Sequence, residues 1–253
     1  MDADVTLTAA SPGWRDAYVR ARHREGRLLP DALVAQLPIV PRDHPLLREW
    51  RARQDSCARL VRYLRIHPRL HTVLDAGCGN GWLAARMAAL SDIAVVGVDV
   101  SVVELDQARR VFREVPNLTF LDQDLLSAPL PGKGADIVVL ASVIQYLPYP
   151  ARLVSALLDA SRVTTEVHVL DSPIYESTEI PGARARTERH YTGIGVPEMA
   201  AAYNHHDWRA FDGLSMDVLY RPSGAWRRLD RHVLRRARSP FPWLRFRRPA
   251  SPP

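Results

Sequence analysis

Lysine and cysteine are the residue types that this 253-residue chain contains least of. Its two cysteines, Cys57 and Cys78, lack the spacing of metal ligands, which excludes a structural zinc site built from cysteines. So few cysteines are typical of a reducing compartment, so we expect a cytoplasmic protein. Lys133 is the only lysine, and arginine supplies the rest of the 34 basic side chains. Abundant arginine with almost no lysine is the composition that we expect from a GC-rich bacterial genome.

Long apolar runs are also absent. No run approaches the roughly 18 apolar residues that a membrane-spanning helix needs, so we expect no membrane partner. Residues 1–10 contain two aspartates and no basic residue, and the first basic residue is Arg15. This pattern lacks the charged segment and apolar centre of a secretory signal.

The chain has a basic excess that is unevenly distributed. Its formal net charge is +6 and its pI is about 9.7. Much of the excess lies in Arg221–Arg248. A solvated arginine-rich face and a surface for an anionic substrate or nucleic acid both fit this pattern. With 47% hydrophobic residues, the chain can bury one sizeable core.

A glycine-rich stretch, Thr72–Ala84, is the most informative part of the sequence. Gly77, Gly79 and Gly81 alternate directly after an apolar run, and a helix-like segment follows them. Glycine tolerates positive φ angles and has no Cβ, so such a turn can bring backbone N–H groups close to a ligand. The spacing differs from the G-x-G-x-x-G of dinucleotide enzymes and from the Walker loop.

Acidic residues follow the next two predicted strands. Asp99 ends the apolar run 93–98, about twenty residues after the first glycine. A carboxylate at the carboxyl end of a second strand can accept hydrogen bonds from both ribose hydroxyls of a nucleoside. Asp124 follows the third predicted strand, 118–121, and a fourth strand, 135–141, leads into Ser142–Leu147.

Taken in order, these features resemble class I S-adenosylmethionine-dependent methyltransferases over Thr72–Asp171. The resemblance implies an α/β fold: a Rossmann-like seven-stranded sheet with helices on both faces. It also implies S-adenosyl-L-methionine as cofactor and S-adenosyl-L-homocysteine as product. The residues that it assigns to the donor site are Asp75, Gly77, Cys78, Gly79, Gly81, Asp99, Val100, Asp124, Leu125 and Ala141.

The remaining segments suggest two domains. Residues 1–70 form a helical N-terminal extension with predicted helices at 14–28, 31–37 and about 46–66. This extension either covers the active site as a lid or only buries an edge of the sheet. Residues 71–253 form the methyltransferase core, with an insert at 172–211 on the substrate side. The predicted strands 216–221 and 241–248 match the antiparallel pair that ends the family's sheet.

The insert carries most of the candidate catalytic residues. His190 and Tyr191 precede glycines at 193 and 195, which would let a loop bend over the site. His205 and Tyr146 are further candidates, because histidine is the usual general base near neutral pH and Tyr146 could orient a substrate. Surface or structural roles remain open for all four. Asp171 could be a base, a substrate ligand or a solvated loop residue.

Several absences narrow the chemistry that the resemblance implies. Strand four has no acidic residue after it, so we expect no catalytic metal. The Asn/Asp-Pro-Pro-Tyr/Phe motif of nucleobase amino-methyltransferases is missing. We therefore expect methyl transfer to an O, N or C atom of a small organic acceptor, in a biosynthetic pathway of bacterial natural products. An RNA or protein methyltransferase, or a non-methylating cyclase or binding protein, is the alternative. Oligomeric state is left open, with a homodimer among the options.

Overall fold

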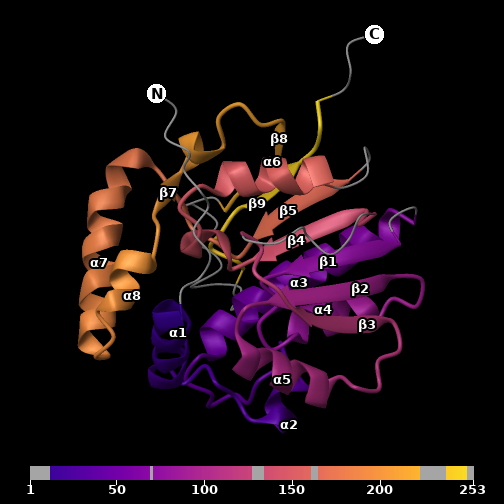
Figure 1. The fold of residues 1–253 in the computed structure, drawn as a ribbon, viewed down its shortest axis with the longest axis horizontal. Coiled ribbons are helices and arrows are strands. Elements are labelled where there is room, and N and C mark those ends of the chain that lie inside the picture. Colours follow the sequence, from indigo (N-terminus) through magenta and orange to yellow (C-terminus); the bar gives the residue numbers. More distant parts are fainter. Residues whose placement is uncertain (1–11, 69–70, 127–133, 161–164, 223–237, 250–253) are drawn as a thin grey trace.

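A computed structural model describes residues 12–68, 71–126, 134–160, 165–222 and 238–249. Its centre is a seven-stranded sheet in the order β3-β2-β1-β4-β5-β9-β8 (Figure 1). The first five strands along the chain are parallel, β9 is antiparallel to β5, and β8 is antiparallel to β9. This confirms the predicted fold class, including its antiparallel edge. The strands are β1 (Thr72–Ala76), β2 (Ala94–Asp99), β3 (Leu118–Asp122), β4 (Ile137–Ala141), β5 (Glu166–Leu170), β8 (Met216–Tyr220) and β9 (Trp243–Phe246).

Helices cover both faces of this sheet. The helices α3, α4 and α5 pack on one face, and α6 packs on the other (Figure 1). The predicted elements are present, with ends shifted by a few residues. Their bounds are α1 (Pro12–Arg24), α2 (Asp31–Val34), α3 (Leu47–Ile66), α4 (Trp82–Ala88), α5 (Val102–Val111) and α6 (Pro150–Ala160).

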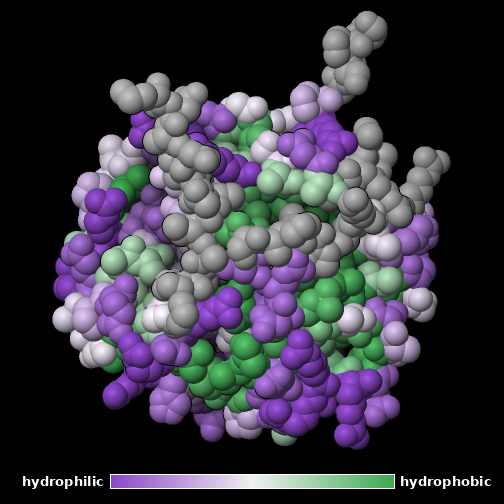
Figure 2. All heavy atoms as spheres, viewed as in Figure 1, coloured by the Kyte–Doolittle hydropathy of each residue, from purple (hydrophilic) through white to green (hydrophobic). Residues whose placement is uncertain are grey.

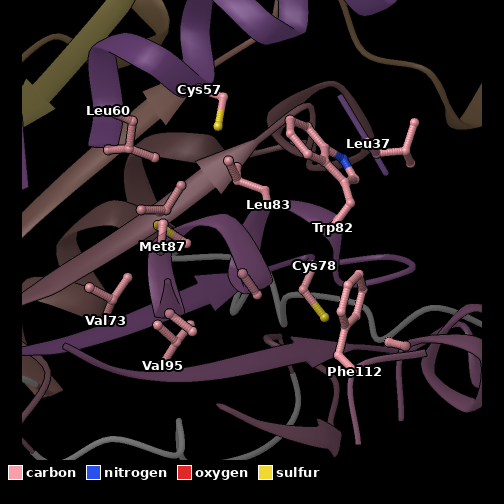
Figure 3. Packing of buried hydrophobic residues seen from close by; sticks show 14 of the residues in the cluster. Leu37, Cys57, Leu60, Val73, Cys78, Trp82, Leu83, Met87, Val95 and Phe112 are labelled. Atoms are coloured by element: carbon pink, nitrogen blue, oxygen red, sulfur yellow. The ribbon is translucent and has the colours of Figure 1, made fainter. Parts of the chain in front are cut away.

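The two faces of the sheet bury separate apolar clusters. In β4, Ile137 and Val139 point to the α3–α4 side, whereas Val138 and Leu140 point to the α6 side. All four side chains are fully buried, as the central strand of a parallel sheet requires. On the α3–α4 side, side chains from both helices belong to one cluster with Val73 of β1 (Figure 3). This packing fixes the carboxyl ends of the strands in one row.

The insert folds into helices of its own. It contains α7 (Ile180–Gly193), α8 (Glu198–Ala202) and two short paired strands, β6 (Ile174–Tyr175) and β7 (His206–Asp207). The expectation that a loop around residues 190–195 bends over the site was therefore wrong, because the regular helix α7 runs through to Gly193. The side chains of Glu176 and Glu179 form a capping box just before this helix. Figure 1 shows α7 and α8 beside α1, away from the sheet.

A third apolar cluster joins the insert to the N-terminal helix. Ala17 and Ala21 of α1 pack with Tyr191 of α7 and Met199 of α8. An ion pair between Arg20 of α1 and Glu198 of α8 adds to the contact. The insert and the N-terminal helix therefore pack together as one layer.

The surface is polar where the insert faces solvent. Figure 2 shows hydrophilic side chains spread over the outer margin of this face, including the region of α7. Arg245 and Arg247 form ion pairs with Asp217. The double arginines at 227–228 and 235–236 lie outside the described residues. Of the helices in the described ranges, none combines the length and the apolar character that crossing a membrane needs.

We predict that Gly81→Ala strongly destabilises the fold. Gly81 adopts φ +74°, and a Cβ there would lie 2.5 Å from Phe120 Cζ and 2.9 Å from Ala108 Cβ. Strained backbone and overpacking together should lower the free energy of unfolding by roughly 2–4 kcal/mol. Denaturant titration of both proteins measures this difference.

Gly193→Ala is the matched control. Gly193 ends α7, and no atom lies within 4 Å of the position of an added Cβ. This substitution should leave stability unchanged or raise it by up to about 1 kcal/mol. Equal destabilisation by the two substitutions would contradict the packing described for the glycine turn.

Candidate functional site

The glycine turn connects β1 to α4 at the carboxyl edge of the sheet. Gly77, Gly79 and Gly81 all have positive φ angles, of 82°, 52° and 74°. A Cβ on Gly77 would collide with the side chain of Val143, which follows β4. The turn therefore needs glycine both for its backbone conformation and for its close approach to the neighbouring strand end.

Protein acceptors already bind most N–H groups of this turn. The N–H groups of Gly77 and Cys78 donate to the carbonyl of Val98, at 2.7 and 3.0 Å. The N–H of Gly81 donates to the carbonyl of Cys78 at 3.0 Å. The sequence suggested that these groups would face a ligand, but in the structure they hold the shape of the turn.

Asp99 ties the turn to the end of β2. One of its carboxylate oxygens accepts the N–H of Gly79 at 2.7 Å. The other accepts the N–H groups of Val100 and Ser101, each at 2.8 Å. Three backbone donors on one carboxylate therefore link the first and second strand ends.

A cavity of about 1450 Å³ extends from the glycine turn to the insert. Its wall includes Arg22 of α1, Trp50 of α3 and Cys78 of the turn. It continues through Gln145, in the short 3₁₀ helix η1 (Ile144–Tyr146) after β4, to Tyr191 of α7. Pockets for one small ligand are typically about 300–1,000 Å³, so this cavity has room for two.

Four buried polar atoms in the cavity wall lack hydrogen-bond partners among the described residues. They are Arg22 Nε, Trp50 Nε1, Glu104 Oε2 and Gln145 Oε1. Buried polar groups are nearly always hydrogen-bonded in folded proteins, because leaving one unpaired costs about 1–3 kcal/mol. Unpaired donors and acceptors around one cavity therefore fit a ligand with matching polar groups.

Glu104 stands next to the glycine turn and is tied to the N-terminal helix. Its side chain is only 2% exposed, although it carries a carboxylate. Its Oε1 accepts a hydrogen bond from Arg22 of α1 at 3.3 Å. The same oxygen lies 3.3 Å from where a Cβ of Gly79 would be. The ion pair therefore connects α1 to the end of the cavity beside the glycine turn, which we call the floor of the cavity.

Burial raises the pKa values of two carboxylates under this floor. Desolvation, together with the charge of Asp99, raises the pKa of Asp75 to about 7. Desolvation and the charge of Glu104 likewise raise the pKa of Asp99, and its three backbone hydrogen bonds oppose that shift. Negative charge concentrated at this edge favours a cationic ligand.

Two non-glycine residues with positive φ follow β4 and β5. Ser142 has φ 60° and Asp171 has φ 50°. The Ser142 hydroxyl donates to the main-chain carbonyl of Asp171 at 2.9 Å. Oδ1 of Asp171 accepts hydrogen bonds from Ser56 at 2.6 Å and from Ser239 at 3.2 Å. Both strained residues line the cavity.

Comparison with known proteins agrees with this geometry. Residues 73–166 match the sequence model of a family described as a methyltransferase domain. The fold resembles the crystal structure of magnesium protoporphyrin IX methyltransferase from Synechocystis PCC 6803 with bound S-adenosylhomocysteine. That match has a TM-score of 0.56 at 17% identity and covers 94% of this chain and 95% of the other.

Curated relatives match over shorter stretches. An uncharacterized methyltransferase of Mycobacterium tuberculosis is 37% identical over 75 residues, which are 30% of this chain and 37% of the relative. A tRNA U34 carboxymethyltransferase of Desulfotalea psychrophila is 32% identical over 117 residues, which are 44% of this chain and 35% of the relative. The chain therefore spans little more than a third of the length of these relatives.

The matched domain belongs to the class I S-adenosylmethionine-dependent methyltransferases. The order of strands, with its antiparallel edge, agrees with this assignment. In this methyltransferase domain, Gly77, Cys78, Gly79 and Ala141 of the predicted donor residues line the cavity. The other six predicted residues do not line this cavity and lie in strands, at strand ends or in turns: Asp75, Gly81, Asp99, Val100, Asp124 and Leu125.

The predicted catalytic residues are distributed over two cavities. Tyr146 and Tyr191 line the main cavity, where their hydroxyls are hydrogen-bonded to each other and burial raises the pKa of both. His190 also lines it, but its side chain is 50% exposed and bonds Glu25 at 2.7 Å. His205 instead lies in the wall of a second cavity of about 580 Å³.

Sequence reasoning missed Arg22 and Glu104. A carboxylate five residues after Asp99, on the side of α5 that otherwise buries Leu105 and Ala108, was a detectable signal for Glu104. Nothing in the sequence points to Arg22, because its role depends on where α1 packs.

Metal ligands are not assembled in the described part of the methyltransferase domain. No group of three or more histidine, cysteine, aspartate or glutamate side chains is placed there to hold an ion. Asp171 has serine partners rather than other carboxylates. Its position at the end of β5 therefore calls for a different explanation.

We predict that Asp75→Asn changes how stability depends on pH. The pKa of Asp75 is about 7 in the folded protein, against about 3.9 for an unfolded aspartate, so the native state loses stability as pH rises from 4 to 7. The variant lacks this loss. Its free energy of unfolding should therefore rise relative to that of the wild type by up to about 1.4 kcal/mol per pH unit in that range. Denaturant titrations at pH 5 and pH 7.5 measure the gain, and a constant difference would contradict it.

Proposed function

We propose that this protein transfers a methyl group from S-adenosylmethionine to a small organic acceptor. The observation that carries the proposal is the set of unpaired polar atoms around one cavity that begins at the glycine turn. The cavity is large enough for a donor and an acceptor together. A ligand class with both hydroxyl and charged groups suits this wall.

The donor would bind at the turn between β1 and α4. Gly77 and Gly79 allow close approach, Trp50 Nε1 can donate, and Glu104 Oε2 can accept. When bound, the donor supplies a methyl group on a positively charged sulfur. The carboxylates of Asp99 and Glu104 attract that positive charge across a partly dry site.

The acceptor would bind between η1 and the layer made by α1 and α7. This layer, formed by the extension and the insert, would act as a lid that excludes water and aligns the acceptor with the methyl group. Arg22 couples the lid to the donor side through Glu104. The porphyrin methyltransferase with a similar fold is likewise named for a small-molecule acceptor.

A nucleic acid acceptor is the second candidate. Arg48, Arg51 and Arg186 line the cavity and have no ion pair with any described residue. The tRNA-modifying relative points the same way. Binding of RNA that weakens steeply as salt rises from 50 to 200 mM would favour this candidate. Donor binding without methyl transfer to any acceptor would favour a cyclase or a binding protein.

Calorimetric titration of the wild type and Glu104→Gln with S-adenosylmethionine tests the donor site. We expect micromolar binding to the wild type and at least tenfold weaker binding to the variant, because the variant loses a buried negative charge beside the turn. S-adenosylhomocysteine lacks the sulfonium charge, so its affinity should fall less.

Glu114→Gln is the matched control, because this glutamate side chain is 85% exposed and its ion pair among the described residues is with the neighbouring Arg113. It should bind both compounds like the wild type. Thermal unfolding without ligand checks that Glu104→Gln is folded. Absence of binding to either compound in the wild type would contradict the proposed function.

A further inference from the structure

One buried carboxylate on the acceptor side has no part in the proposed donor site. Asp171 directly follows β5, lines the cavity and is only 8% exposed. Open α/β sheets bind their ligands beyond the carboxyl ends of the strands, which is where Asp171 lies. Its φ of 50° is unfavourable for a residue with a side chain and persists only where the surroundings enforce it.

The surroundings hold this carboxylate asymmetrically. Ser56 on α3 and Ser239, which precedes β9, both donate to Oδ1. Oδ2 accepts no hydrogen bond from any described residue. Ser142, the second strained residue, fixes the main chain of Asp171 through its hydroxyl. One oxygen is therefore anchored, and the other remains able to accept a proton from a molecule in the cavity.

Charges around Asp171 are few. Arg53 and Arg59 on α3 favour its ionised form, and the thiol of Cys57 lies on the same helix. Burial outweighs these effects and raises the pKa of the Asp171 carboxyl. A carboxylate with a raised pKa takes up a proton more readily than an ordinary one.

The wall of the same cavity also contains aromatic rings. Tyr146 lies edge-on to Tyr18 at 5.7 Å and to Tyr203 at 5.9 Å. Gln145 Oε1, also in the wall, is buried and unpaired. Gln145 Oε1 and Asp171 Oδ2 are both acceptors. A molecule that contacts both therefore donates hydrogen bonds, and the rings in the wall favour an apolar, ring-compatible frame.

We propose that Asp171 is the general base of the transfer and that the acceptor is a hydroxylated aromatic ring. This inference rests on the proposed function. The proton of the ring hydroxyl passes to Asp171 Oδ2 as the oxygen forms a bond to the methyl carbon. The carbon–sulfur bond breaks and leaves its electron pair on sulfur. The products are an aryl methyl ether and S-adenosylhomocysteine, and Asp171 then releases the proton to solvent.

Methyl transfer from S-adenosylmethionine labelled with tritium in the methyl group tests the acceptor class. The probes are catechol, 4-hydroxybenzoate and 2-naphthol, with anisole and cyclohexanol as matched compounds that lack the hydroxyl or the aromatic ring. We expect transfer to at least one phenol and to neither control. Donor binding without transfer to any phenol would overturn this inference and leave the donor site standing, whereas absence of donor binding defeats the proposed function itself.

Asp171→Asn tests the base, with Asp92→Asn at an exposed position as control. We expect kcat to fall at least 100-fold in Asp171→Asn while its Kd for S-adenosylmethionine stays within twofold. Wild-type kcat should rise with pH as Asp171 ionises, and the variant should lose this rise. A variant that keeps more than a tenth of kcat, or the same pH profile, overturns the assignment.

Ser56→Ala gives a second measurement that does not remove the carboxylate. Loss of one donor to the ionised form raises the pKa of Asp171, so the acid limb of the kcat profile should move to higher pH. The plateau at high pH should remain within threefold of the wild type. An unmoved limb would show that Asp171 is not the group that titrates.

Discussion

The carboxylate of Asp99 is the contact on which the candidate site depends. It accepts three backbone N–H groups, one from the glycine turn and two from the residues between β2 and α5. The turn is thereby held in a conformation that favours glycine at three positions. Because these contacts join two strand ends, the floor of the cavity is set by the sheet itself and not by a mobile loop.

Several carboxylates lie at this floor, and Arg22 in the layer above it supplies a positive charge that pairs with one of them. Asp75, Asp99 and Glu104 lie close enough that burial and mutual repulsion raise the pKa values of the first two. Arg22 reaches Glu104 from α1, so the position of the covering layer and the charge of the floor are coupled. A cationic donor would relieve the same repulsion, which makes donor binding and closure of the layer mutually favourable.

Local sequence patterns predicted the sheet well because its signals are short in range. Apolar runs that end in glycine or aspartate marked the strand ends, and the order of strands followed from the resemblance. The same reasoning took the residues around His190 for a bending loop, although helix α7 runs through them. The contacts of Arg22 and Glu104 join residues 82 positions apart, so no local pattern could predict them. The serine partners of Asp171 come from α3 and from a segment near the C-terminus, and they are equally non-local.

A crystal structure of the protein with S-adenosylhomocysteine tests the central claim most directly. We predict the ligand in the main cavity, with its amino-acid part over Gly77–Gly79 and a polar group within 3.2 Å of Glu104 Oε2. The space between the ligand's sulfur and Asp171 should remain open for an acceptor. A ligand bound elsewhere, or a cavity floor that stays unpaired around Glu104 with the ligand present, would contradict the donor site.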